Sequence, residues 1–243
     1  MPHFFIDDSN INENQIIIND IDNYKHIARA LRARVGEKLL LIDNHQIQYE
    51  TVILKISNNE IICDIKKSYK SERDLEFNLY LAQSPLRSES QITLTEKATE
   101  LGIRGIYPII TDNCAVKKQV AQSKVEKWQK VMYEASKQCE RARIPVCYPI
   151  STLEDVIKND FDRIIVFGER STEQSLKTYL RKQPIEKNEN ILIIIGPEGG
   201  FSGKEFAFFR EKNYPIITLG NLILKADTAV TVAIGDIVYE YQG

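Results

Sequence analysis

The chain has 243 residues, of which 43% are hydrophobic and 27% charged, and its formal net charge is −2. This composition is typical of a globular protein with a sizeable core, built as one large domain or two small ones. No apolar run is long enough to cross a bilayer and the N-terminus lacks a signal-peptide pattern, so we expect a cytoplasmic protein without membrane contacts. Four scattered cysteines and three dispersed histidines argue against a disulfide framework and against a metal site.

Positive charge is concentrated in two stretches of the chain. Five basic residues and one acid lie between Lys25 and Lys38, and eight basic residues and three acids lie between Lys117 and Arg143. Local basic stripes on a nearly neutral chain are typical of a protein that binds a polyanion at one site. Solvated helix faces explain either stripe equally well, so both interpretations stay open at this point.

The first 70 residues predict a small β-barrel, because short apolar runs alternate with turns rich in Asn, Asp and Gly. One helix, from about Ile21 to Arg34 and ending before Gly36, interrupts these strands. The charged stretch Lys66–Asp74 is interpreted as a linker, which gives domain bounds of 1–70 and 71–243. The strand candidates are Phe4–Ile6, Ile16–Ile18, Leu39–Ile42, Thr51–Ile56 and Ile61–Ile65.

From Leu75 onward strands and helices alternate, which predicts a parallel α/β sheet. The run Ile191–Ile195 has no polar alternation, as expected for a strand that is covered on both faces. A helix from Lys124 that ends before Pro145 carries an apolar face with Trp128 and Met132. Serines followed three residues later by Glu predict capped helix starts at Ser123, Ser151 and Ser202. The strand candidates are Leu75–Ala82, Gly105–Ile110, Ile164–Phe167, Ile191–Ile195 and Ile216–Leu219.

Two glycine-containing segments, Ile195–Ser202 and Leu219–Ala229, each follow a buried-strand pattern and lead into a helix pattern. Glycine lets the backbone turn sharply and approach a ligand closely, and neighbouring strand ends are where an open α/β sheet usually binds its ligand. Neither segment is a P-loop, a G-x-G-x-x-G fingerprint or a G-x-S-x-G elbow, which argues against the common nucleotide-binding and hydrolase folds.

Five motifs in chain order resemble the SPOUT class of S-adenosylmethionine methyltransferases. Within that class, the chain resembles the bacterial family that methylates N3 of a uridine in 16S ribosomal RNA of the small subunit (the RsmE family). The motifs span nearly the whole chain, so the set is far more specific than any one of them. They are His26–Arg32 before Gly36, Glu96–Gly102, Glu134-Ala135…Gln138…Arg141 with Ile144-Pro145, Gly196–Ser202, and Leu219-Gly220…Ile223-Leu224…Thr228-Ala229.

The resemblance implies an N-terminal PUA-like barrel that helps to bind RNA. It also implies a C-terminal SPOUT-type α/β domain with a parallel sheet, whose last loops form a deep trefoil knot around S-adenosylmethionine, usually in a homodimer. The substrate would be 16S ribosomal RNA, either free or within the assembled small subunit. Two alternatives stay open: a SPOUT enzyme that acts on another base or a ribose 2′-hydroxyl, and a non-catalytic RNA-binding protein.

The cofactor residues implied by the resemblance lie in the two glycine segments. Backbone groups there could contact the adenine edge, with Ile223 and Leu224 packed on its faces, because a cofactor pocket needs few polar groups in apolar walls. A structural role, with glycines shaping turns and leucines in the core, is the alternative. The residues are Gly196, Pro197, Glu198, Gly199, Leu219, Gly220, Asn221, Ile223 and Leu224.

Methyl transfer to uridine N3 requires that this nitrogen lose its proton, because the neutral imide is a poor nucleophile. Lys225 is the candidate for stabilising charge on a uracil oxygen, and Asp227 or Glu198 for accepting the proton. The alternatives are that Asp227 only caps the last helix, expected over Asp227–Tyr241, and that Glu198 only favours a helix N-terminus.

Phosphate contacts are expected from three arginines of the N-terminal domain. Glu134, Gln138 and Arg141 have the spacing of one polar helical stripe, which is expected to line the RNA side of the cleft. A purely structural salt bridge between helices is the alternative for Glu134 and for Arg141. His26 is expected to be packed rather than catalytic. The expected phosphate-binding residues are Arg29, Arg32 and Arg34.

The chain departs from the family pattern at several positions. Lys225 stands where the family usually has Arg, and Asp227 where it usually has Glu. Lys keeps the positive charge but lacks the planar bidentate fork of Arg. Asn221 stands where a basic residue is common, and Asn113-Cys114 where Arg-Ser is familiar.

Overall fold

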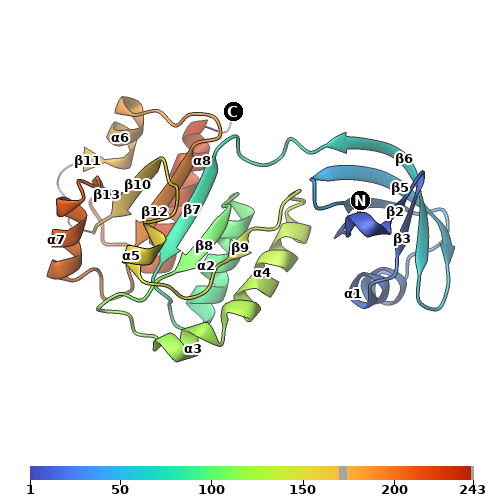
Figure 1. The fold of residues 1–243 in the computed structure, drawn as a ribbon, viewed down its shortest axis with the longest axis horizontal. Coiled ribbons are helices and arrows are strands. Elements are labelled where there is room, and N and C mark those ends of the chain that lie inside the picture. The colour runs from blue at the N-terminus through green and yellow to red at the C-terminus, as the bar shows by residue number, and fades with distance from the viewer. Residues whose placement is uncertain (170–173, 242–243) are drawn as a thin grey trace. The chain divides into compact units, whose positions relative to one another are not determined.

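The computed structural model describes residues 1–169 and 174–241, and the chain divides into two compact units (Figure 1). The N-terminal unit comprises Met1–Asp74 with Ser136–Arg143, and the C-terminal unit comprises Leu75–Ala135 with Ile144–Gly243. A short piece of the second half of the chain thus packs with the first 74 residues. Within the described residues, every helix is too short or too polar to cross a membrane.

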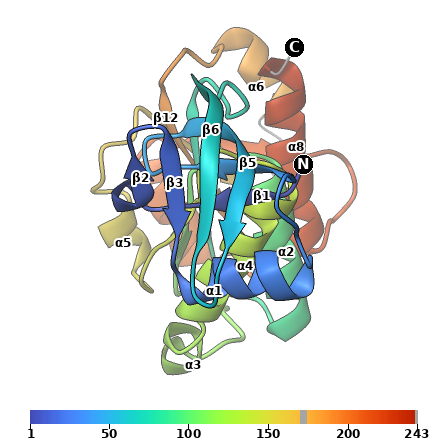
Figure 2. The ribbon, with the colours of Figure 1, turned by 90° about the vertical axis from the view of Figure 1, so that its right-hand side faces the viewer.

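The N-terminal unit is built on a six-stranded sheet with the order β1-β4-β5-β6-β3-β2 (Figure 2). β1 and β4 pair in parallel, and the other neighbours are antiparallel. Phe4, Ile18, Leu41 and Ile61 belong to its buried core. The strands are β1 His3–Phe5, β2 Ile11–Asn12, β3 Gln15–Ile18, β4 Lys38–Ile42, β5 Ile47–Ile56 and β6 Ile61–Lys70, with a 3-10 turn at Asp8–Asn10.

The helix of this unit is shorter than predicted. It begins as α1, Ile21–Tyr24, where the carboxylate of the N-cap Asp20 accepts the N–H of Asn23 at 2.8 Å, and continues as a π-helical segment, Lys25–Ala30. The predicted end at Arg34 is wrong, because Arg32 has a φ of 52° and takes the chain out of helical geometry.

The predicted linker at Lys66–Asp74 is also partly wrong. β6 continues to Lys70, and its last residues pair with β5, from Glu50 opposite Lys67 to Ile47 opposite Lys70. Lys66, Lys67 and Lys70 are exposed, so this half of the strand lacks the apolar residues on which the sequence reasoning relied.

The C-terminal unit is a seven-stranded sheet with the order β11-β13-β10-β12-β7-β8-β9, and every neighbouring pair is parallel. The prediction of a parallel α/β sheet is therefore confirmed. β12 lies centrally, and all five residues from Ile191 to Ile195 are buried. The strands are β7 Asn78–Gln83, β8 Gly105–Pro108, β9 Val146–Cys147, β10 Arg163–Phe167, β11 Gln174–Ser175, β12 Asn190–Ile195 and β13 Ile216–Thr218.

Helices cover both faces of this sheet (Figure 1). Ile193 of β12 packs in one cluster with Leu94 of α2 and Ile234 of α8, whereas its neighbour Ile194 packs in another with Phe209 of α7. This alternation is the reason for the continuous apolar pattern of β12. The helices are α2 Ser88–Glu100, α3 Lys118–Gln122, α4 Val125–Gln138, α5 Leu153–Val156, α6 Leu176–Lys182, α7 Gly203–Glu211 and α8 Ala226–Tyr241.

One of the three predicted helix caps is confirmed. Ser202 forms a capping box with Glu205 at the start of α7. Ser123 instead follows the last turn of α3, where its hydroxyl donates to the carbonyl of Val120 at 2.9 Å. At α5 the N-cap is Thr152, one residue later than predicted. The helix begins at Leu153, whose side chain is buried.

Candidate active site

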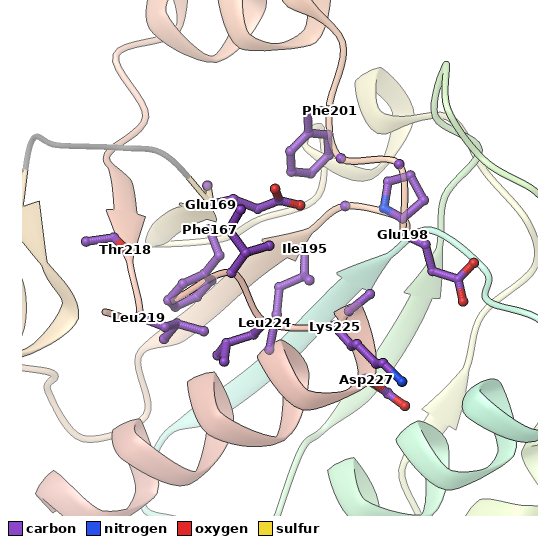
Figure 3. Close-up of a pocket in the computed structure, with 18 of the residues that line it drawn as sticks. Phe167, Glu169, Ile195, Glu198, Phe201, Thr218, Leu219, Leu224, Lys225 and Asp227 are labelled. Atoms are coloured by element: carbon purple, nitrogen blue, oxygen red, sulfur yellow. The ribbon is translucent and has the colours of Figure 1, made fainter. Parts of the chain in front are cut away.

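A pocket of about 730 Å³ lies in the C-terminal unit where β10, β12 and β13 end (Figure 3). The carboxyl ends of parallel strands meet at this edge, so the loops that follow them converge there. Both predicted glycine segments contribute to the pocket. Its lining comprises residues 167–169, 195–201, 217–219 and 222–227, together with Leu86, Ser90, Phe206 and Ala229.

The pocket combines apolar walls with a small number of charged groups. Phe167, Ile195 and Leu224 gather between the strand ends and α8 in Figure 3. In the same view, the charged ends of Lys225 and Asp227 point toward the side of the pocket on which Glu198 lies. Apolar walls with few polar groups are typical of a site for a partly apolar organic ligand.

The first glycine segment forms a tight turn between β12 and α7. The N–H of Gly200 donates to the carbonyl of Pro197 at 2.9 Å, and Gly200 has a φ of +67°, which glycine adopts without strain. A Cβ on Gly196 would lie 3.2 to 3.3 Å from three ring atoms of Phe201, which itself lines the pocket. The absence of a side chain at Gly196 therefore lets this ring pack against the turn.

The second glycine segment connects β13 to α8. The hydroxyl of Thr218 donates to the carbonyl of Gly220 at 2.8 Å and accepts the N–H of the same residue at 3.3 Å. Gly220 has a φ of +141°, a backbone conformation that L side chains rarely adopt. The following Leu222 and Ile223 are 80% and 61% exposed, so this segment presents large apolar side chains at the rim of the pocket.

Most of the residues expected to bind a cofactor come together in this pocket. Gly220 and Asn221 do not line it, although they belong to the loop that does. The sequence identified the correct loops, but it did not distinguish the residues of a loop that face inward from those that face away. The expected residues that line the pocket are Gly196, Pro197, Glu198, Gly199, Leu219, Ile223 and Leu224.

The three candidates for chemistry, Glu198, Lys225 and Asp227, all line the pocket. Asp227 is the second residue of α8 and not its N-cap, and its carboxylate accepts the N–H of Thr228 at 2.8 Å. A carboxylate in the first turn of a helix is favoured by the helix dipole, so a structural contribution of Asp227 is compatible with its place in the pocket.

The arginines expected to contact phosphate lie at the end of the π-helical segment and in the turn that follows it. All three side chains are exposed, and within the described residues none of them forms an ion pair. They are Arg29, Arg32 and Arg34.

The predicted polar stripe is wrong for Arg141, whereas Glu134 and Gln138 both lie on α4 and are exposed. α4 ends at Gln138 and Glu140 has a φ of 58°, so helical spacing does not extend to Arg141. The side chain of Arg141 is 6% exposed, and its Nε donates to Asp74 at 2.9 Å. We therefore correct the assignment of Arg141 from an RNA contact to a buried structural ion pair, whereas Gln138 is exposed.

The ring of His26 is packed, as expected. Its ring contacts Phe4 edge to face at 5.3 Å, and its Nδ1 lies 3.2 Å from the Nζ of Lys137. Within residues 1–169 and 174–241, no group of three or more His, Cys, Asp or Glu side chains could hold a metal ion.

Sequence reasoning missed part of the lining. Phe167 is the last residue of β10 and Glu169 lies two residues beyond it, whereas Leu86 precedes α2 and Ser90 lies in its first turn. An acid just after a buried strand was a usable signal for Glu169. No such signal existed for Leu86 and Ser90, because their proximity to the pocket depends on β7 lying beside β12.

The parallel sheet with this pocket at its carboxyl edge defines a doubly wound α/β ligand-binding domain. The family model described as "RNA methyltransferase domain" matches residues 73–238, and the model "RNA methyltransferase PUA domain" matches residues 18–66. The chain belongs to this family and is an RNA methyltransferase.

Relatives and a solved structure of similar length resemble this chain. The "Ribosomal RNA small subunit methyltransferase E" of Rickettsia conorii is 29% identical over 94% of this chain and 92% of its own length, and that of Bacillus subtilis is 24% identical over 89% and 87%. A structure of the same-named Neisseria gonorrhoeae enzyme, bound to S-adenosyl methionine, is similar with a TM-score of 0.84 at 21% identity, covering 99% of this chain and 98% of its own.

Proposed function

We propose that this protein methylates N3 of a uridine in 16S ribosomal RNA, with S-adenosylmethionine as the methyl donor. The observation that carries the proposal is the pocket formed by the two glycine segments in a chain of the RNA methyltransferase family. The names of the relatives support small-subunit ribosomal RNA as the substrate.

The residues of the pocket fit this donor. Its volume of about 730 Å³ lies within the ~300–1,000 Å³ common for small-molecule sites. Backbone groups of Gly196–Gly199 and Leu219–Leu224 would hold the adenine edge, with the apolar side chains of Ile223 and Leu224 on its faces. When bound, the donor supplies a methyl group activated by a sulfonium cation.

The chain itself must position the uracil and handle its N3 proton. Lys225 would stabilise negative charge on a uracil oxygen, because an ammonium near a developing anion lowers the energy of the transition state. Asp227 or Glu198 would accept the proton, since both carboxylates line the same pocket.

RNA binding is proposed for the N-terminal domain, with bounds of 1–70 for the PUA-like barrel and 71–243 for the methyltransferase domain. The exposed arginines, which form no ion pair with any residue that the structure describes, and the match of residues 18–66 to a PUA domain support this assignment. Gln138 is kept as a further RNA contact because its side chain is exposed. The phosphate-binding residues are Arg29, Arg32 and Arg34.

We further propose a homodimer, a trefoil knot in the C-terminal loops and a cytoplasmic location. The highly exposed Leu222 and Ile223 support the dimer, because large apolar side chains at a surface are favoured when a partner covers them. A second copy would then complete the rim of the pocket.

Mass mapping of small-subunit ribosomal RNA from a deletion strain tests the proposed reaction. We expect one uridine to be lighter by a methyl group, and purified protein with S-adenosylmethionine to restore that methyl group on N3. Parallel reactions on free RNA and on assembled subunits identify the form of the substrate. Methylation of a ribose 2′-hydroxyl, or an unchanged RNA mass, would contradict the proposal.

A further inference from the structure

The loop between β8 and α3 contacts the first glycine segment, Ile195–Ser202, through side chains that do not line the pocket. Asn113 lies in this loop, and its Nδ2 donates to the carbonyl of Gly199 at 3.2 Å and to that of Gly200 at 3.1 Å. One side-chain amide thus binds two successive carbonyls of the turn that lines the pocket.

The fit between Asn113 and the turn is close. A Cβ on Gly199 would lie 3.1 Å from the Cβ of Asn113 and 3.4 Å from its backbone oxygen. A side chain at position 199 would therefore crowd Asn113, and glycine lets the turn approach Asn113 without this contact.

The neighbouring Asp112 anchors the same loop to the start of α7. The N–H of Asp112 donates to one carboxylate oxygen of Glu205 at 3.1 Å, while the other oxygen accepts the N–H of Ser202 at 2.7 Å. The hydroxyl of Ser202 donates to the carboxylate of Asp112 at 2.6 Å. Asn113 is thereby fixed relative to the cap of α7, at the far end of the turn.

We propose that Asn113 is a positioning residue that fixes the Gly199–Gly200 turn for binding of the methyl donor. The proposal rests on the proposed function, because it assigns a role to Asn113 in the same pocket. Glycine-containing turns have large conformational freedom, and fixing one before the ligand arrives lowers the entropic cost of binding.

A purely structural role of Asn113 would lower the melting temperature when Asn113 is replaced, whereas a positioning role would mainly weaken binding of the methyl donor. Asn113 is exposed, so its side chain adds little to the buried core and its loss should leave the melting temperature nearly unchanged. The turn, however, would lose both of its side-chain hydrogen bonds, and the dissociation constant of S-adenosylmethionine should rise by about tenfold.

The test uses the full chain with Asn113→Ala and Asn113→Asp. The aspartate has the same shape but cannot donate when ionised, and it repels the two carbonyls, so we expect it to weaken donor binding more than alanine does. Asn159→Asp is the matched control, because Asn159 donates to the carbonyl of Val156 at 2.7 Å outside the pocket lining.

Calorimetry with S-adenosylmethionine, melting temperature and steady-state kinetics are measured for all four proteins. We expect both Asn113 variants to raise the dissociation constant and the KM for the donor while kcat and melting temperature stay close to wild type, and the control to leave donor binding unchanged. Wild-type affinity in both Asn113 variants would overturn the positioning role alone. A wild-type protein that does not bind the donor would overturn the proposed function and this inference with it.

Discussion

Substituting Gly196 should damage the pocket from within. In Gly196→Ala, the new Cβ would lie 3.2 to 3.3 Å from three ring atoms of Phe201. Phe201 is 9% exposed, and its ring packs edge to face against Phe209 at 5.0 Å and Phe206 at 5.8 Å, so it has little room to withdraw toward α7. Overpacking of this kind costs about 1–3 kcal/mol.

The expected consequences follow from that magnitude. A loss of ~2 kcal/mol in a protein of this size lowers the melting temperature by roughly 4–8 °C. Because Phe201 lines the pocket, its displacement should also weaken binding of S-adenosylmethionine by about tenfold or more.

Gly203→Ala is the matched control, since its Cβ would meet nothing within 4 Å and Gly203 is the first residue of α7. Alanine at a helical position should stabilise the protein by about 0.5–1 kcal/mol and leave donor binding unchanged. Thermal unfolding and calorimetry measure both effects. Wild-type stability and donor affinity in Gly196→Ala would show that Phe201 is not displaced.

Three further predictions follow from other parts of the chain. Lys225→Ala should abolish methyl transfer in a radiolabel assay with nearly normal donor binding, and full turnover would remove Lys225 from the mechanism. Burial lowers the pKa of His3 to about 4, so the free energy of unfolding, measured by urea titration, should fall as the pH decreases from about 6.5 toward 4. His3→Leu should reduce this loss of stability, and an equal loss in the variant and the wild type would contradict the assignment to His3. Replacing the exposed Arg29, Arg32 and Arg34 together by alanine should weaken RNA binding and make the binding constant less dependent on salt concentration. An unchanged slope of log K against log salt concentration would refute phosphate contact by these three arginines.

Local patterns predicted the apolar strands well, because a run such as Ile191–Ile195 has few alternatives to burial on both faces. They predicted helix starts less well. Ser151 and Thr152 are adjacent and both can cap, and the choice between them depends on which position buries Leu153. The strand at Lys66–Lys70 was missed because its pairing partner, not its own composition, makes it a strand.

The candidate site shows the same division between local and long-range information. The glycine segments were found because each combines a strand end with a turn that needs glycine. Leu86 and Ser90 lie at the pocket because β7 pairs with β12, and local sequence patterns do not reveal this pairing. Arg141 was misassigned because a left-handed residue at Glu140 ends the helical spacing on which the stripe depended.

A crystal structure of the protein with S-adenosylmethionine would show whether the two glycine segments hold the methyl donor. We expect electron density for the adenine between Gly196–Gly199 and Leu219–Leu224, with the methyl group directed toward the side where Lys225 lies. Density for the donor at any other site, or a pocket filled by the protein's own side chains, would contradict it.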